Sequence, residues 1–326
     1  MLENQILNHV LHWEECICDW CGSSEQEQIF RGPDRLEKLP GIFCLVRCTG
    51  CGTYRQNPRL TWESLTKYYP DDYISYSYDV ANSKNSWRRY IKDYGNRKRR
   101  RIIESFQPGG NLLEIGCGTG GFLRELSKSG KWKLTGIEPS EVAANFASNS
   151  TSAKIIRSRL SDVSLDRESF DAIVLWTVIE HLSHPIRDLE YIASLIKPNG
   201  WLLFSIPNLE SVDAKIFRQY WSGWDLPRHL YLFPRGVVRD VMSSMGFRIA
   251  KERCISTSYA GLGHSLEFWS QLWEHKYPRT KDFIKRIYHS WITRVSLLIP
   301  LAILDRLNLT STITFIAQKR NTGVVR

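Results

Sequence analysis

Apolar and polar positions between residues 112 and 140 predict two strands and the start of a helix. Residues 112–115 form a short, mainly apolar run that is followed by closely spaced glycines and then by a helical pattern. A second apolar run ends within residues 136–140, where an acidic residue follows it. Glycine lets the backbone approach a ligand where a Cβ atom would collide, and a helix start offers N–H groups without intrahelical partners. The pattern therefore predicts a nucleotide-sized ligand site at the end of the first strand.

A helical pattern precedes that strand. The apolar positions of residues 84–106 recur at roughly helical spacing, which predicts an amphipathic helix. Nine of its residues are basic: Lys84, Arg88, Arg89, Lys92, Arg97, Lys98, Arg99, Arg100 and Arg101. The simplest interpretation is a solvated basic face, and contact with anionic lipid headgroups, a nucleotide-linked sugar or RNA is the alternative. Because no aromatic and basic RNA-binding signature accompanies the run, nucleic acid is disfavoured as a partner.

The glycine run differs from the dinucleotide fingerprint G-x-G-x-x-G, because it reads E-x-G-C-G-T-G-G from Glu114 onward. It resembles motif I of the class I S-adenosylmethionine-dependent methyltransferases. The resemblance implies that Glu114 faces the amino acid part of the cationic cofactor. Residues 169–182 and 196–208 resemble the fourth strand with its loop and the fifth strand of the same family. The expected fold is α/β, a Rossmann-like seven-stranded methyltransferase sheet.

The expected cofactor site follows from these motifs. Glu138 closes the second strand, where a carboxylate suits the two hydroxyls of a ribose. Many relatives place an acid after the third strand, where it binds the adenine, but Arg159 occupies that position here. The adenine is therefore expected to be bound by backbone groups near Leu160 or by Asp162. The predicted cofactor-binding residues are Glu114, Gly116, Cys117, Gly118, Gly120, Glu138, Pro139, Leu160 and Trp176.

Cysteines near the start of the chain predict a metal site. Cys18 and Cys21 form one C-x-x-C-G turn, and Cys48 and Cys51 form another. Two such turns complete a tetrahedral shell of four thiolates for zinc, which has no open position and is therefore structural. A redox dithiol and free buried thiols are the alternatives, and the nearby cysteines at 16 and 44 could substitute as ligands. The segment resembles the N-terminal zinc-ribbon extension of bacterial methyltransferases from secondary-metabolite and cell-surface saccharide pathways.

The segment 208–235 is the expected substrate loop, because ligands of an open parallel sheet bind beyond the carboxyl ends of its strands. Its string from Trp224 to Leu230, which contains Pro227, Arg228 and His229, is similar to a segment of that family in which a tryptophan precedes P-R-H. Trp224, Arg228 and Tyr231 are predicted to bind substrate, with Arg228 clamping a phosphate or carboxylate. His229 and His181 are the candidate catalytic bases, and the alternative for His181 is that it only caps the next helix.

A helical insertion is expected at residues 257–310, between a sixth strand at 247–253 and an antiparallel seventh at 311–318. Its apolar run at 295–304 contains Pro300 and is too short to span a membrane. The run is expected to pack on the core or on a dimer partner, and interfacial membrane contact or access to a lipid-linked substrate is the alternative. The predicted domains are a zinc ribbon at 1–60, a linker with the basic helix at 61–106 and the methyltransferase domain at 107–326.

Composition agrees with a globular enzyme. The chain has 326 residues, 42% hydrophobic and 24% charged, and residues 1–15 lack the basic start and apolar stretch of a secretory signal, so a cytoplasmic protein is expected. The expected activity is methyl transfer from S-adenosylmethionine to a hydroxyl of a saccharide or other small biosynthetic intermediate. The alternatives are carbon methylation of a keto-sugar, RNA methylation and a non-catalytic zinc-containing binding protein. The sequence leaves the oligomeric state open.

Overall fold

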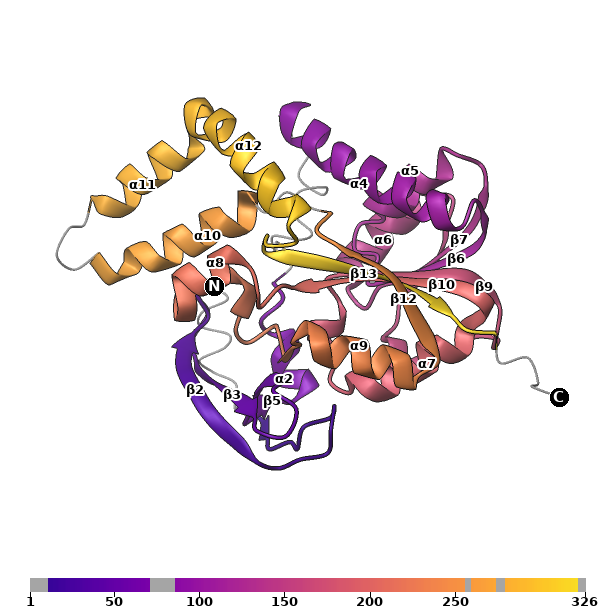
Figure 1. Cartoon of the computed structure of the whole chain (residues 1–326), viewed down its shortest axis with the longest axis horizontal. Helices are drawn as coiled ribbons and strands as arrows, with labels where there is room; N and C mark the ends of the chain where they lie inside the picture. The colour runs from indigo at the N-terminus through magenta and orange to yellow at the C-terminus, as the bar shows by residue number, and fades with distance from the viewer. Residues whose placement is uncertain (1–10, 71–85, 256–258, 274–278, 322–326) are drawn as a thin grey trace. The chain divides into compact units, whose positions relative to one another are not determined.

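A computed structural model describes residues 11–70, 86–255, 259–273 and 279–321 (Figure 1). Lys84 of the predicted basic helix and residues 1–10 lie outside the described residues. The chain forms two compact units, each built from separated segments. The first unit comprises Met1–Tyr68, Ile206–Val238 and Arg253–Ile313, and the second comprises Tyr69–Ser205, Arg239–Glu252 and Thr314–Arg326.

The second unit is organised around a seven-stranded sheet with the strand order β12-β13-β10-β9-β6-β7-β8. The strands are β6 (Gly110–Ile115), β7 (Trp132–Ile137), β8 (Lys154–Ile156), β9 (Phe170–Trp176), β10 (Ile196–Pro207), β12 (Phe247–Arg253) and β13 (Thr312–Lys319). The pairings from β8 through β7, β6 and β9 to β10 are all parallel. The predicted Rossmann-like sheet of seven strands is confirmed.

Helices and a hydrophobic core complete this unit. The helices are α4 (Ser86–Phe106), α5 (Gly121–Ser127), α6 (Glu141–Ser150), α7 (Pro185–Leu195) and α9 (Arg235–Ser244, shared with the first unit), with short 3-10 turns η1 (Leu160–Asp162) and η2 (Ile179–His181). The central strands are apolar and fully buried, as at Leu113 and Ile173, because a parallel sheet carries helices on both faces. Their carboxyl ends therefore supply the polar residues of the site.

The predicted basic helix is present as α4, but its charges do not form a purely solvated face. Arg99 is half-buried and its guanidinium lies over the ring of Trp176, 4.6 Å from the centroid. Arg100 pairs with the buried Glu125 at 3.1 Å. These two arginines correct the interpretation of the whole run as solvent-facing, because each meets a group inside its own unit.

The first unit contains the cysteine-rich segment. Its strands are β1 (Trp13–Glu14), β2 (Gln26–Pro33), β3 (Ile42–Cys48), β4 (Tyr54–Gln56), β5 (Arg59–Leu60) and β11 (Tyr231–Leu232), and α2 (Trp62–Thr66) follows β5. β2 and β3 pair antiparallel, as expected for the arms of a ribbon. β11 adds to the edge of β4, so part of the predicted substrate loop is a strand of this four-stranded sheet.

The remainder of the first unit is helical. It comprises α8 (Val212–Phe217), η3 (Arg218–Tyr220), η4 (Ser222–Trp224), α10 (Tyr259–Ser270), η5 (Gln271–Trp273), α11 (Thr280–His289) and α12 (Trp291–Arg306). The predicted helical insertion therefore consists of α10, η5, α11 and α12. Among the described helices, none alone has the length and apolarity to cross a membrane; α11 and α12 meet those criteria only together, across a bend of 65°.

Candidate functional site

The glycine turn after β6 is fixed by backbone hydrogen bonds to β7. The N–H groups of Gly116 and Cys117 both donate to the carbonyl of Ile137, at 2.8 and 3.0 Å. Gly118 has φ +51°, and a Cβ atom built there would meet nothing within 4 Å. The space in front of Gly118 is therefore a cradle in which a ligand can approach the backbone.

The other two predicted glycines serve packing. A Cβ at Gly116 would lie 2.6 Å from the Val178 side chain, and one at Gly120 would lie 2.9 Å from Thr151. Both residues also have positive φ, which a residue with a side chain adopts only with strain. Gly116 and Gly120 shape the turn, whereas Gly118 borders the open space.

Glu138 stands at the end of β7 and closes the same turn. Its carboxylate accepts hydrogen bonds from the N–H of Gly118 at 2.8 Å and from the N–H of Ser140 at 2.9 Å. An ionised carboxylate has about four acceptor positions, so these two bonds are compatible with hydrogen bonds from ribose hydroxyls. Glu138 is thereby held rigidly at the cradle.

Glu114 lies deeper in the turn and is almost fully buried. Its Oε2 atom has no hydrogen-bond partner among the described residues. Burial raises the pKa of Glu114 to about 8, Arg99 opposes this shift and Glu138 adds to it. A buried carboxyl group without a partner is costly unless a ligand satisfies it, and a cationic ligand would do so best.

Arg99 and Trp176 extend this corner of the site. Trp176 ends β9, is 8% exposed and has a buried indole Nε1 without a partner among the described residues. Sequence reasoning placed Trp176 at the cofactor and missed Arg99. A usable signal was the spacing of Asn96, Arg99 and Ile103, which puts Arg99 on the same face of α4 as two buried residues.

The other predicted cofactor residues take different positions. Cys117 is buried, and its pKa is raised by this burial, so its thiol stays protonated at neutral pH. Leu160 is buried in η1, which begins four residues after the end of β8, whereas Pro139 after β7 is exposed. Asp162, the alternative adenine partner, is exposed and accepts a hydrogen bond from Ser161 at 2.8 Å.

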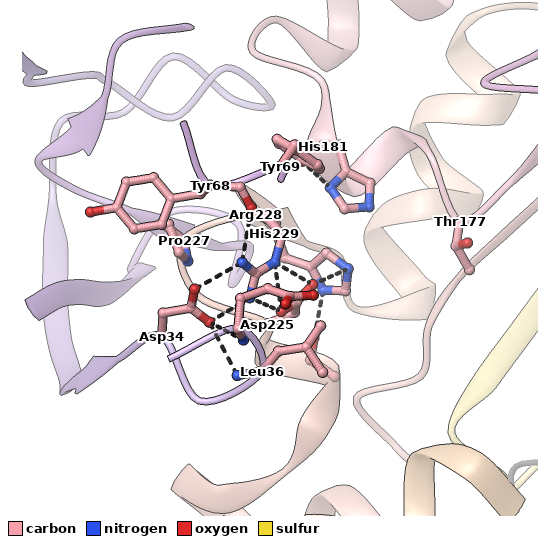
Figure 2. A network of polar contacts seen from close by, with 12 residues as sticks. Asp34, Leu36, Tyr68, Tyr69, Thr177, His181, Asp225, Pro227, Arg228 and His229 are labelled. Atoms are coloured by element: carbon pink, nitrogen blue, oxygen red, sulfur yellow. Dashed lines mark hydrogen bonds and ion pairs between the residues drawn. The ribbon is translucent and has the colours of Figure 1, made fainter. Parts of the chain in front are cut away.

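His181 belongs to the unit that holds the cofactor cradle. It lies in η2, four residues after Thr177, and its Nδ1 is 3.0 Å from the hydroxyl of Tyr69 (Figure 2). Either atom can be the donor, depending on the tautomer of the ring. The proposed role of His181 as only a helix cap is not supported, because α7 has His184 as its N-cap residue.

His229 is held in the first unit. Its Nδ1 lies 2.8 Å from the carbonyl oxygen of Gly223. Because a carbonyl only accepts, Nδ1 carries a proton and Nε2 is the basic atom of the neutral ring. Burial lowers the pKa of His229, while Asp225 acts in the opposite direction, so the ring is neutral at physiological pH.

Arg228 is surrounded by protein carboxylates (Figure 2). Its fully buried guanidinium donates to Asp34 at 2.6 Å, to Asp225 at 2.7 Å and to the carbonyl of Tyr68 at 3.2 Å. Burial opposes its charge, but Asp225 and Asp34 hold its pKa above the ordinary value. The structure corrects the prediction of a substrate-anion clamp, since this side chain binds two segments of its own unit.

Tyr231 and Trp224 differ in accessibility. Tyr231 is 1% exposed, stacks on Phe233 and accepts a hydrogen bond from Arg59, so its predicted contact with substrate is corrected to a packing role. Trp224 is half-buried and meets Phe30 edge to face at 5.6 Å. A groove beside Trp224 is lined by Ile29, Phe30, Lys215, Ile216, Phe217, Arg218, Gln219, Tyr220, Trp224 and Trp269. Trp224 therefore remains a candidate for binding a ring.

The four predicted metal ligands form one cluster. The ligand atoms of Cys18, Cys21, Cys48 and Cys51 all lie within 4.8 Å of one another. Two of the sulfur pairs, Cys18 with Cys51 and Cys21 with Cys48, are 3.6 and 3.5 Å apart. A tetrahedral zinc shell with Zn–S bonds of about 2.3 Å puts its sulfurs about 3.8 Å apart, so the donor set fits this metal.

The two turns that carry these thiols have the same backbone geometry. The N–H of Gly22 donates to the carbonyl of Cys18, and the N–H of Gly52 donates to the carbonyl of Cys48. The two substitute ligands considered from sequence lie outside the cluster. The Cys16 thiol faces the carbonyl of Gln56, and the Cys44 thiol faces Gln28.

The parallel sheet, the open glycine cradle and the two acids beside it give this unit a Rossmann-like fold with a candidate ligand site at the carboxyl ends of β6 and β7. Residues 86–252, about half of the chain, match the family model of a methyltransferase domain. The chain therefore belongs to this family, the S-adenosylmethionine-dependent methyltransferases.

Curated relatives agree with this assignment. The chain is 30% identical over 185 residues to a ubiquinone biosynthesis O-methyltransferase of Bradyrhizobium diazoefficiens, covering 54% of this chain and 71% of the relative. It is 33% identical over 105 residues to the enzyme of that name from Coxiella burnetii, covering 31% of this chain and 44% of the relative. The chain thus spans less than half of the length of the second relative.

A solved structure supports the fold. Phosphoethanolamine N-methyltransferase 2 of Haemonchus contortus, in complex with S-adenosyl-L-methionine, has a TM-score of 0.51 and 18% identity, covering 82% of this chain and 62% of its own. At this identity the likeness describes the fold and not the acceptor.

Proposed function

We propose that this chain transfers a methyl group from S-adenosylmethionine to a hydroxyl oxygen of a small-molecule acceptor, and that a structural zinc ion stabilises its first unit. The observation that carries the choice of oxygen is the similarity to relatives named as O-methyltransferases. Membership of the family supports methyl transfer itself.

The cofactor would be held by residues of the second unit. Glu114 offers its unpartnered oxygen to the positively charged end, Glu138 faces the ribose and Gly118 lets the backbone approach. When bound, S-adenosylmethionine supplies a methyl group on a positively charged sulfur. The burial of Glu114 and Trp176 at the same corner would exclude water from this charge.

The acceptor hydroxyl must lose its proton as its oxygen gains the methyl group. A histidine base at such a step contributes roughly 10²–10⁴-fold in rate. His229 is our first candidate, because its Nδ1 is fixed by Gly223 and its neutral ring presents Nε2 as the base. His181 is the second, because it lies in the same unit as the cradle.

The acceptor class is also part of the proposal. The groove beside Trp224 has five aromatic residues, Trp224 included, and two cationic residues in its lining, which suits a ring-bearing acceptor such as a saccharide or a phenol. The sequence motifs favour a saccharide or another biosynthetic intermediate. We retain this class and a cytoplasmic location as proposals.

Zinc is proposed for the four-thiol cluster as a structural ion. Its support is the matched geometry of the two turns and sulfur spacings close to those of a tetrahedral shell. Four thiolates leave no coordination position for water or substrate, so the ion takes no part in methyl transfer.

Transfer of a labelled methyl group tests the activity. The full chain is incubated with methyl-labelled S-adenosylmethionine and with saccharide, phenolic small-molecule or RNA fractions, and Glu114→Gln serves as the cofactor-site variant. We expect label in a small-molecule fraction, released by treatments that cleave methyl ethers and absent with Glu114→Gln. Label in RNA, or on carbon of the product, would contradict the proposal.

A further inference from the structure

Helix α12 has apolar residues on all sides and yet is largely exposed. Among its residues only Leu301 is buried, whereas Trp291 and Ile299 are each 73% exposed. The exposed apolar residues of the helix and its end are Trp291, Ile292, Val295, Leu298, Ile299, Ile303 and Leu307. A helix that is hydrophobic on all sides is normally covered by protein or by lipid, and exposed patches of this kind mark interaction sites.

Helix α11 continues the same apolar surface. One side of α11 is held to α10, because Tyr288 stacks on Tyr259 with ring centroids 4.3 Å apart and a Cβ at Gly263 would collide with the Tyr288 ring. The other side exposes Phe283 and Ile287. Figure 1 shows α11 and α12 as consecutive helices that meet at an angle. We call the exposed apolar side chains of α11 and α12 the apolar hairpin surface.

The geometry of the pair fits the surface of a bilayer better than its interior. α12 has 16 residues, which at 1.5 Å per residue make about 24 Å, less than the roughly 30 Å of a hydrocarbon core. The bend of 65° between the helices falls at Ser290, whose hydroxyl accepts the N–H of Thr293 and caps α12. Both helices can therefore lie along an interface with their apolar side chains inserted.

Charge indicates which partner covers this surface. The sequence 279–306 contains six lysine and arginine residues against two aspartates. A two-fold dimer would bring this positive segment against its own copy, which is repulsive. An anionic lipid surface is complementary to it, and tryptophan near a helix end is typical of the interface between water and lipid.

We propose that the apolar hairpin surface docks this protein on an anionic lipid bilayer. Exposed apolar side chains enter the acyl boundary, and neighbouring basic side chains meet the headgroups. The proposal concerns α11 and α12 alone and does not depend on which acceptor is methylated.

Co-sedimentation of the full chain with vesicles tests this docking. One set of vesicles is phosphatidylcholine, and the other contains equal parts of phosphatidylcholine and phosphatidylglycerol. We expect binding to the anionic set, weakened by added salt, and little binding to the neutral set. Ile299→Gln should bind the anionic vesicles about tenfold more weakly, because it replaces one of the exposed apolar side chains that enter the acyl boundary with a polar one.

A matched control is Ile42→Gln, which replaces an exposed isoleucine on β3 of the same unit. This variant should bind vesicles like the unaltered protein, and both variants should keep the unfolding temperature because each site is exposed. Equal binding by the Ile299→Gln and unaltered proteins would overturn the proposal. Failure of the unaltered protein to bind either vesicle set would also overturn the proposal. In that case, a dimer that sediments intact and that Ile299→Gln dissociates would identify a second copy of the chain as the partner of this surface.

Discussion

Arg228 and Asp34 form an ion pair of 2.6 Å between two side chains that expose no surface, although 194 residues separate them in the chain. Asp34 follows the ribbon strand β2, and Arg228 precedes β11 in the segment expected to be a substrate loop. The pair joins these two segments within the first unit. The segment from Trp224 to Leu230 is therefore bound to the ribbon through Arg228.

Removing one partner of this pair should destabilise the first unit strongly. We expect Arg228→Ala to lower the free energy of unfolding by about 3–5 kcal/mol, because Asp34 and Asp225 are then left near one another without their shared cation. Urea unfolding followed by circular dichroism measures this change. A loss below about 1 kcal/mol would show that the buried network contributes little.

Arg47→Ala provides the comparison for that experiment. Arg47 pairs with Glu27 at 3.1 Å in the same unit, but both side chains are about half exposed. Exposed pairs contribute roughly 0–1 kcal/mol, so this variant should unfold at nearly the same urea concentration as the unaltered protein.

Cofactor binding should release a proton from Glu114. The pKa of this carboxyl is raised to about 8 by burial, so much of it is protonated at pH 7, and a bound cation favours the ionised form. The affinity for S-adenosylmethionine should therefore rise with pH from 6 toward 8, by up to about tenfold per pH unit. Calorimetry in buffers of different ionisation enthalpy measures the released proton directly.

Two variants identify the source of that proton. Glu114→Gln should bind more weakly and lose most of the proton release, whereas Glu141→Gln replaces an exposed glutamate paired with Arg157 and should retain it. Undiminished proton release by Glu114→Gln would assign the titration to another group, such as the amino group of the cofactor.

Zinc removal should unfold the first unit before the second. Structural zinc contributes on the order of 10 kcal/mol to the folding of small metal-dependent segments, and the four thiols lie where a tetrahedral shell requires them. We expect one zinc ion per chain by elemental analysis, lost with Cys48→Ser. Cys44→Ser should keep the ion, because the Cys44 thiol faces Gln28. Equal zinc content in the two variants would contradict the assignment.

Sequence patterns within short windows predicted the parts of the fold whose conformation is set by residues close together in the chain. The glycine turn, the apolar strands and the helix α4 each have a sequence period or a motif within a short window, and the structure contains all of them. The paired C-x-x-C-G turns likewise identified four thiols that lie together. The reason is that backbone conformation and alternation of burial are set mainly by neighbours in sequence.

Partners that lie far apart in sequence could not be predicted in this way. Arg228 and Tyr231 have the residue types of a binding site, but Asp34 and Asp225 bind Arg228, and the pairing of β11 with β4 buries Tyr231. Arg99 stands in a run of basic residues, and only the packing of α4 shows that it reaches Trp176 and Glu114. A charged side chain gives the same sequence signal whether it meets substrate, solvent or a buried acid.

His229 gives the sharpest test of catalysis. If it is the base, His229→Asn should lower kcat by roughly 10²–10⁴-fold with little change in the KM for cofactor, because the amide can still donate to the Gly223 carbonyl while Nε2 is lost. A base must be neutral, and burial places the pKa of His229 below 6.5, so the acid limb of kcat should lie below pH 6.5.

Histidine variants elsewhere separate this role from a structural one. His184→Asn changes an exposed histidine before α7 and should leave kcat unchanged. His181→Asn should reduce kcat less than His229→Asn, and Tyr69→Phe removes the hydroxyl that lies 3.0 Å from the His181 Nδ1 atom. A large loss in His181→Asn together with a normal rate in His229→Asn would move the base to the second unit, beside the cofactor cradle. In that case the hydroxyl of Tyr69 would set the tautomer of the catalytic ring.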